Sequence, residues 1–478
     1  MKKTSVEGMN DYLPAEAGLR EKLIARISEV YSRAGFCKII TPAVESGENL
    51  AGSDGGDNLR LIYKILKRGD KLTKALESGQ VTENQLSDLG LRYDLTLPLA
   101  RYYACHKDKL PSPFKVIQIG SVYRAERPQK GRLREFTQCD IDILGSAGND
   151  CEVELIAVTA DALRAAGLSV QAPEFTVRIN DRRLLRDTLL HLGIAENLHG
   201  GVCVILDKLD KIGANGAAAE LFEKGFAAHI DEAERVVRTF AELDFTAFTQ
   251  ISPEAAASLL AICESCKKLG IAVTFDPTLV RGQGYYTGTI FEISSTGYGG
   301  TIAGGGRYDG LVSKFSGGKD DVPAVGFSIG FERIFTLLCG REEPVSKAAI
   351  LYHTNIAEAI LYRREIADKY DSVVIAEKKK KLSKQLSSLA AAGVKKAIIL
   401  EDKKEIDIEP LKVFARTLKR HFDGILIYFN TRLTNAIAES INTTVKRIKR
   451  VACGMRDMKS FIHRIYLSTA SKRGIIFQ

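Results

Sequence analysis

The chain has 478 residues, which is enough for two to four domains and a large buried core, so it is long enough to be an enzyme. Apolar residues make up 45 % and charged residues 27 %, and no run of about 18 apolar residues occurs, which excludes a protein that spans a membrane with helices. The first residues lack the apolar stretch of a secretory signal, so we expect a cytoplasmic protein. The nine cysteines are scattered and odd in number, which argues against a disulfide framework.

The net charge of +9 comes from one end of the chain. Residues 412–478 contain 14 Lys and Arg against 3 Asp and Glu, a net charge of +11, and subtracting this from +9 leaves −2 for residues 1–411. Phosphate or nucleic-acid binding by residues 1–411 must therefore depend on local clusters of basic side chains.

The first 150 residues mix helices with strands. Apolar residues at helical spacing predict a helix over Arg20–Ala34, which Gly35 ends. A second helix is predicted over Asp150–Ala166, with Asn149 as a cap and Gly167 at its end. Alternating or apolar runs predict strands at 37–40, 114–119 and 139–144.

Beyond this region the pattern changes twice. Ala-rich helical segments predict a helical insertion at about 194–269, after which the sheet resumes with strands at 288–293 and 323–328 and a helix at 329–338. Strands and helices then alternate as in a parallel α/β domain, at 348–352, 356–370, 372–376, 380–392 and 396–400. We predict an α+β chain with three parts: 1–340, a short α/β domain at 345–411, and a basic tail at 412–478.

Polar side chains gather between and along two of these strands. Tyr123–Phe136 carries five cations, and Arg side chains bind phosphate oxygens bidentately, although a solvated hairpin explains the charge alone equally well. In the next strand Gln138, Asp140 and Asp142 share one face. Because Asp is disfavoured in strands, this polar face predicts a pocket rather than solvated surface.

Three further segments combine polar side chains with an apolar frame or with glycines. Residues 91–98 hold an acid and a hydroxyl, residues 281–288 surround two tyrosines with glycines, and residues 301–310 predict a three-glycine turn. Each signal is weak alone, and none matches a Walker or dinucleotide-binding sequence. Cys263 and Cys266 form a single CxxC, for which we predict structural thiols rather than zinc ligands, and we predict no metal site.

In this order and spacing, the segments resemble the histidyl-tRNA synthetases, a family of class II aminoacyl-tRNA synthetases. The resemblance extends from about Gly8 to Arg333 and implies a class II antiparallel sheet flanked by helices, followed by an anticodon-binding-like domain. It is carried by an opening segment at 8–14, by three class II motifs, of which the first ends at 41–42 and the others lie at 123–136 and 326–333, and by two signature peptides of the histidine enzyme at 281–288 and 303–310.

The resemblance implies ATP-dependent activation of L-histidine to histidyl-adenylate, then transfer to the 3′ end of tRNA(His) with release of AMP and pyrophosphate. It also implies Mg²⁺ as the ATP counter-ion and a homodimer. The implied catalytic residues are Arg281 and Arg124. The implied ATP-binding residues are Arg124, Glu126, Arg132, Arg281 and Arg333. The implied histidine-binding residues are Asp94, Leu95, Thr96, Gln138, Asp142, Tyr285, Tyr286 and Tyr308.

One alternative is the regulatory paralogue of this family, which associates with ATP phosphoribosyltransferase in histidine biosynthesis and does not charge tRNA. That paralogue generally lacks the C-terminal α/β domain and some catalytic residues. Here Arg124, Arg281 and Arg333 are present, so we favour the enzyme. Gly284 stands where the family often has an acid, so the contact that this acid makes is missing.

The C-terminal part departs from the family. The α/β pattern resembles the anticodon-binding domain over Ala348–Leu400 but lacks the last elements of that domain. Residues 421–473 resemble the end of insertion-sequence transposases, in which Glu439 would be the last of three catalytic acids. Because the other two acids would belong to a domain that this chain does not have, we predict a gene fusion and no catalytic role for Glu439.

Overall fold

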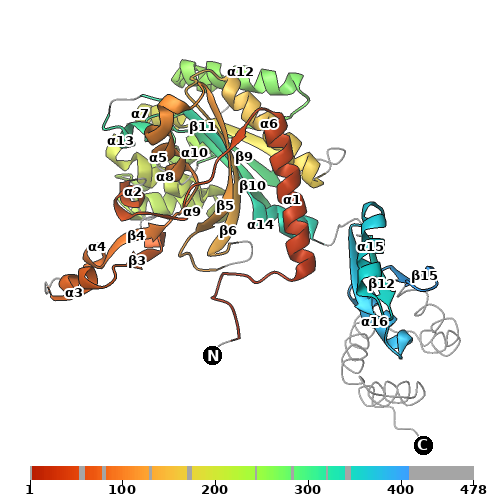
Figure 1. Ribbon diagram of the computed structural model, residues 1–478. Coiled ribbons are helices and arrows are strands. Elements are labelled where there is room, and N and C mark those ends of the chain that lie inside the picture. Colours follow the sequence, from red (N-terminus) through yellow and green to blue (C-terminus); the bar gives the residue numbers. More distant parts are fainter. Residues whose placement is uncertain are drawn as a thin grey trace, which may run out of the picture. The chain divides into compact units, whose positions relative to one another are not determined.

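The computed structural model describes residues 3–52, 60–77, 82–128, 132–168, 175–242, 245–280, 285–318, 321–339 and 346–408. The chain divides into two compact units, Met1–Arg341 and Glu342–Gln478, each with a sheet of its own (Figure 1). Within the described residues, no helix is both long and apolar enough to cross a bilayer. The predicted tail at 412–478 lies outside the described residues.

An eight-stranded sheet organises the first unit, in the order β1-β5-β6-β11-β10-β9-β7-β8 (Figure 1). Neighbouring strands run antiparallel except at the two edges, where β1 pairs with β5 and β7 with β8 in parallel. A small antiparallel sheet, β2-β4-β3, forms separately. The strands are β1 (Cys37–Lys38), β2 (Val44–Ser46), β3 (Lys64–Leu66), β4 (Ser87–Leu91), β5 (Phe114–Tyr123), β6 (Glu135–Leu144), β7 (Thr176–Asp181), β8 (Val273–Phe275), β9 (Thr289–Ser295), β10 (Gly300–Arg307) and β11 (Ala324–Gly330).

Four helices bury their apolar sides with one face of this sheet: α1 (Pro14–Arg33), α6 (Asp150–Ala166), α12 (Pro253–Lys268) and α14 (Phe331–Leu338). Helix α1 begins six residues before the predicted start because Pro14 suits the first helical turn and Glu16 accepts a hydrogen bond from the Leu13 amide (2.8 Å). Helix α6 has the predicted bounds and ends at Gly167, whose φ of 115° suits a left-handed cap.

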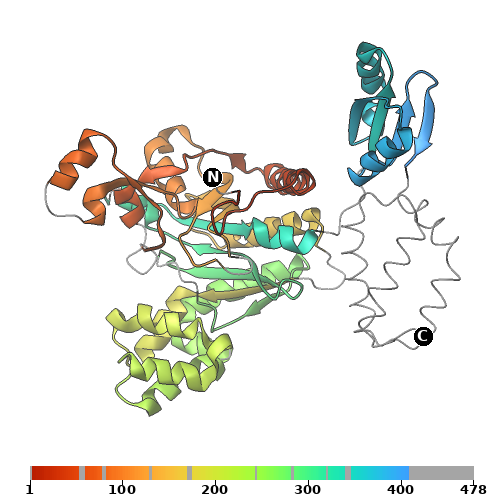
Figure 2. The ribbon, with the colours of Figure 1, turned by 90° about the horizontal axis from the view of Figure 1, so that it is seen from below.

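A second group of helices has its own apolar core, with Leu189, Leu206 and Phe240 among its buried residues. Its members α7 (Arg182–His191), α8 (His199–Leu206), α9 (Leu209–Glu223) and α10 (Ile230–Glu242) form a compact group beside the sheet (Figure 2). Helix α12 also falls within the predicted insertion, but its buried residues belong to the core of the central sheet. The remaining α-helices among the described residues of this unit are α2 (Gly47–Gly52), α3 (Asp70–Glu77), α4 (Glu83–Leu86), α5 (Thr96–His106), α11 (Phe245–Ile251) and α13 (Leu311–Phe315).

The second unit contains a four-stranded sheet in the order β13-β12-β14-β15. Strands β12 (Lys347–Tyr352), β13 (Ser372–Glu377) and β14 (Lys396–Ile399) are parallel and alternate with α15 (Ile356–Glu365) and α16 (Leu382–Ala391), as the sequence predicts. The antiparallel edge strand β15 (Lys404–Asp407) is not predicted, because its charged sequence gives no apolar alternation.

The predicted three-glycine turn at 301–310 is wrong. Gly304, Gly305 and Gly306 lie inside strand β10, paired with both β9 and β11. A Cβ atom at Gly305 would lie 1.9 Å from the Gly326 carbonyl oxygen, so the glycines serve close approach between strands and not a change of direction.

Candidate active site

A cavity of about 490 Å³ lies on the face of the central sheet opposite the α1 and α6 helices. Ten of the thirteen residues predicted for the site line it: Thr96, Arg124, Glu126, Arg132, Gln138, Asp142, Tyr285, Tyr286, Tyr308 and Arg333. Asp94 adjoins this lining, because the Tyr285 hydroxyl donates a 3.5 Å hydrogen bond to its Oδ2 atom. Leu95 is buried, and its carbonyl accepts from Gln118 (2.9 Å). Arg281 and Gly284 lie outside the described residues.

Strand β6 supplies the acidic floor of the cavity. Gln138, Asp140 and Asp142 line it while exposing only 8 %, 3 % and 2 % of their surface. Burial raises the pKa of Asp142 to about 7, although the Tyr308 hydroxyl, which donates to Oδ1 over 2.8 Å, favours the charged form. Burial and the neighbouring Asp142 raise the pKa of Asp140 well above its ordinary value. A cationic ligand group would stabilise the charged form of both acids.

Tyrosines form one wall beside these acids. The rings of Tyr285 and Tyr286 lie 4.9 Å apart, and Tyr308 meets Tyr285 edge-on at 6.0 Å. Burial raises the pKa values of Tyr285 and Tyr308 well above 10, so both hydroxyls remain protonated donors. Asp94 is held from the other side, where its Oδ1 accepts from the Leu97 amide (3.1 Å) at the start of α5. The wall combines flat apolar area with fixed hydroxyl donors.

Three arginines among the predicted site residues, Arg124, Arg132 and Arg333, also line the cavity. The Arg124 guanidinium lies 4.2 Å from the Tyr93 ring centroid and 5.0 Å from that of Phe136, and its Nε donates to the Tyr93 carbonyl (3.2 Å). Arg132 lies 3.7 Å from the Glu126 carboxylate. Arg333 donates to the Thr301 carbonyl over 2.6 Å. These are the fixed, planar cations that bind phosphate oxygens bidentately.

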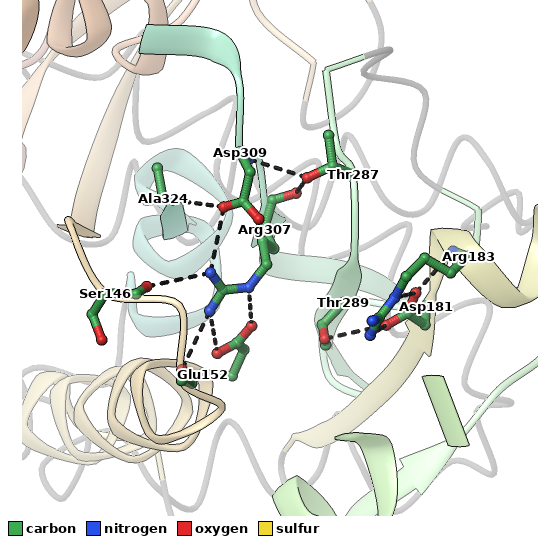
Figure 3. Close-up of polar contacts among 10 residues, drawn as sticks. Ser146, Glu152, Asp181, Arg183, Thr287, Thr289, Arg307, Asp309 and Ala324 are labelled. Carbon is green, nitrogen blue, oxygen red and sulfur yellow. Dashed lines mark hydrogen bonds and ion pairs between the residues drawn. The ribbon is translucent and has the colours of Figure 1, made fainter. Parts of the chain in front are cut away.

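A buried ion pair joins Arg307, the residue before Tyr308, to Glu152 (Figure 3). Arg307 donates from Nε and Nη2 to the two oxygens of Glu152, at 2.7 and 2.8 Å, and Tyr308 follows it directly after the end of β10. The Thr287 amide donates to the Arg307 carbonyl (2.9 Å), and the Thr287 hydroxyl accepts from the Asp309 amide (3.1 Å). This network joins α6, the end of β10 and the segment that carries Tyr285.

The sequence indicated neither this pair nor the ion pairs of Arg178, and it gave Asp140 a place but no role. Arg178, which lines the cavity, pairs with Glu292 of strand β9 (2.5 Å) and with Asp276, which follows strand β8 (2.8 Å). Asp140 was placed on the polar face by its alternation but received no role. The partners in these ion pairs lie 98 to 155 residues apart in the sequence, and only the fold brings them together. For Asp140, the alternation of the strand was the signal that the sequence offered.

Comparisons with known proteins divide the chain in two. A family model described as histidyl-tRNA synthetase matches residues 8–334, and a model described as transposase matches residues 376–465. The transposase match confirms the predicted resemblance but begins in strand β13, upstream of the predicted tail. The histidyl-tRNA synthetase model covers most of the first unit, Met1–Arg341.

Curated relatives and solved structures agree with that family. Histidine–tRNA ligase of Leifsonia xyli subsp. xyli is 41 % identical over 416 residues, which cover 82 % of this chain and 93 % of the relative. Its counterpart in Gloeobacter violaceus is 38 % identical over 362 residues, covering 69 % and 74 %. The structure of histidyl-tRNA synthetase from Nostoc sp. PCC 7120 matches with a TM-score of 0.67 at 25 % identity, over 88 % of this chain and 100 % of the other.

A Bacillus halodurans structure, titled as an ATP phosphoribosyltransferase regulatory subunit/histidyl-tRNA synthetase, matches with a TM-score of 0.65 at 23 % identity, over 81 % of this chain and 97 % of the other. At that identity the match supports the fold alone. The predicted α+β class II fold, with its antiparallel sheet between helices, is confirmed by the sheet order and by the Nostoc structure. The long matches to curated relatives and to the family model show that the chain belongs to the histidyl-tRNA synthetase family.

Proposed function

We propose that this protein is a histidine–tRNA ligase that forms histidyl-adenylate in the cavity and transfers the histidyl group to the 3′ end of tRNA(His). One observation carries the proposal: the same cavity is lined by buried acids and tyrosines and by Arg124, Arg132 and Arg333. The acids and tyrosines suit an ammonium group and an imidazole, while the three arginines suit a triphosphate.

In the first step, a carboxylate oxygen of histidine attacks the α-phosphorus of ATP. The bond from the α-phosphorus to the bridging oxygen breaks, and pyrophosphate leaves with that oxygen. Arg124 and Arg281 would stabilise the charge that develops on the α-phosphate, and Arg333, Arg132 and Glu126 would hold the rest of ATP. Mg²⁺ would enter with ATP as its counter-ion, for which the Glu126 carboxylate offers the oxygen ligands that this metal prefers.

In the second step, the terminal ribose hydroxyl of tRNA(His) releases its proton and attacks the carbonyl carbon of the adenylate. The bond from that carbon to the phosphate oxygen breaks, and AMP leaves with that oxygen. Asp94, Thr96 and Gln138, with the Leu95 backbone, would bind the histidine main-chain groups. Asp142, Tyr285, Tyr286 and Tyr308 would surround the imidazole. Because an apolar amino acid would leave the polar partners of the imidazole unpaired, we expect such a site to reject apolar analogues by about 10⁴–10⁵ without editing.

Aminoacylation of total tRNA with each of the twenty amino acids in turn tests the proposal directly. We expect charging with histidine alone, and histidine-dependent exchange of pyrophosphate into ATP. A protein without either activity that binds ATP phosphoribosyltransferase would instead be the regulatory subunit named in the Bacillus halodurans title. A homodimer and a cytoplasmic location complete the proposal, and light scattering and fractionation of cells test them.

A further inference from the structure

Three polar side chains, Gln138, Ser328 and Asp140, form a short chain of hydrogen bonds between strands β6 and β11. Ser328 is paired in register with Asp140, and Gly330 with Gln138. The Gln138 Nε2 donates to the Ser328 hydroxyl over 2.7 Å, and Ser328 in turn is hydrogen-bonded to the Asp140 carboxyl. All three residues line the cavity.

The donor and acceptor roles in these hydrogen bonds set the orientation of the Gln138 amide. A hydroxyl has one proton, and the Ser328 proton is used on Asp140, so the Ser328 oxygen accepts from Gln138. Gln138 therefore turns its NH₂ group to Ser328, which directs its Oε1 atom away from Ser328. Within the described residues, Gln138 Oε1 and Asp140 Oδ1 are both buried without a hydrogen-bond partner. Two residues that line the cavity thus each hold a buried acceptor without a donor in the described part of the protein.

We propose that Asp140 binds the α-ammonium group of the amino-acid substrate through its Oδ1 atom and, through Ser328, orients Gln138 to bind the same group. The inference rests on the proposed function and adds a residue to it. An ammonium group supplies several N–H donors and a full positive charge, which matches two buried acceptors of which one is a carboxyl group. The groups that face Asp140 are the acids Asp142 and Asp94, which raise its pKa, and Arg124, which lowers it.

Two imidazole compounds separate this role from a structural one. Histamine keeps the ammonium group and the imidazole of histidine but lacks the carboxylate. Imidazolepropionate keeps the imidazole and the carboxylate but lacks the ammonium group. Binding of both compounds to the full-length protein is measured by calorimetry, together with the KM for histidine and the KM for ATP in pyrophosphate exchange.

In Asp140→Asn we expect the affinity for histamine to fall, and the KM for histidine to rise, by about 10- to 150-fold, the range for a hydrogen bond to a charged group. Imidazolepropionate affinity and the KM for ATP should stay unchanged, and the retained imidazolepropionate binding shows that the variant is folded. In Ser328→Ala, where the carboxyl group remains but Gln138 is released, the expected loss for histamine is about 2- to 10-fold.

Asp181→Asn is the matched control. Asp181 is also a buried acid in a strand of the central sheet, but Arg183 occupies both of its oxygens, at 3.0 and 2.8 Å (Figure 3). This variant should leave the ratio of the two affinities unchanged. Equal losses for both compounds in Asp140→Asn, or unchanged histamine binding, would overturn the inference. A wild-type protein that shows no histidine-dependent exchange would overturn the proposed function as well.

Discussion

The two faces of strand β6 are equally buried, but their side chains are satisfied in different ways. Cys139, Ile141 and Ile143 have no exposed surface and pack into the core with α1 and α6. On the cavity side, Gln138, Asp140 and Asp142 are nearly as buried, and each retains a polar atom without a hydrogen-bond partner among the described residues. Burial alone therefore does not distinguish a stabilising face from a binding face.

The difference lies in what each face does to the free energy of folding. The apolar face stabilises the fold by about 1.5–3 kcal/mol for each fully buried large side chain. The polar face opposes folding, since burial of a carboxyl group that stays unpaired favours its neutral form and raises its pKa. A cavity that binds a cation thus depends on the apolar face of the same strand for its stability.

Substitution on the apolar face should give the largest change in stability. We expect Ile141→Ala to lower the free energy of unfolding by about 2–5 kcal/mol, because a cavity would replace a buried side chain. Urea unfolding measures this change, and the smaller Ile141→Val substitution should cost about 0.5–1.5 kcal/mol. The KM for histidine should stay at the wild-type value in both variants, and an increase that parallels the loss of stability would show that the two faces are coupled.

On the cavity side, removal of a catalytic cation should change the rate and not the stability. We expect Arg124→Ala to lower the kcat of pyrophosphate exchange by about 10²–10³-fold, because one stabilising donor of the transition state is lost. Arg281→Ala should do the same. The lysine variants should recover only part of the rate, since an ammonium cannot form the bidentate contact. A wild-type rate in either alanine variant would contradict the assigned role.

Removal of the buried acid Asp142 should stabilise the protein by an amount that depends on pH. The pKa of Asp142 is about 7 in the folded protein, above that of an unfolded Asp, so its contribution to folding is favourable at low pH and is lost as the pH rises through about 7. We expect Asp142→Asn to raise the free energy of unfolding by roughly 1–4 kcal/mol at pH 8 and to have little effect near pH 4. Urea unfolding of both proteins at pH 4 and pH 8 measures this change in the free energy of unfolding. An equal increase at both pH values would show that the burial of a charged Asp142 is not its cause.

Behind the cavity, the Arg307–Glu152 pair should affect substrate binding to a smaller extent. Arg307→Lys keeps the charge but loses the two-point contact with Glu152, so Tyr308 is held less firmly against Asp142. We expect the KM for histidine to rise by about fivefold, equivalent to roughly 1 kcal/mol, with the KM for ATP unchanged. A rise of both constants together would indicate general disorder of the site.

The smallest expected effect lies outside both faces. Truncation after Leu411 removes 14 Lys and Arg but none of the residues proposed for the cavity. We expect unchanged pyrophosphate exchange, together with weaker and less salt-dependent binding to nucleic acid of any sequence. Loss of exchange in a truncated protein that stays folded would show that residues 412–478 are part of the enzyme.

Local patterns in the sequence were sufficient for the elements that one periodicity dominates. Helix α6 has its predicted bounds because a cap and a terminal glycine flank one apolar stripe, and the alternation in β6 predicted its polar face. Strand β10 was missed because three consecutive glycines are typical of a turn. Glycine is needed at 305 because the Gly326 carbonyl of strand β11, which comes later in the chain, leaves no room for a Cβ atom. The Arg307–Glu152 pair joins residues 155 positions apart, and no local pattern encodes such a pairing.

The glycines of β10 and β11 also limit how this cavity can change. Gly305 and Gly326 line it, and a Cβ atom would lie 1.9 Å from the Gly326 carbonyl oxygen in the first case and 1.9 Å from Asp142 Oδ1 in the second. Neither position accepts even an alanine without displacing backbone or an acid of the site. An inhibitor whose contacts are made to the main chain at these two positions would therefore leave few single substitutions through which resistance could arise.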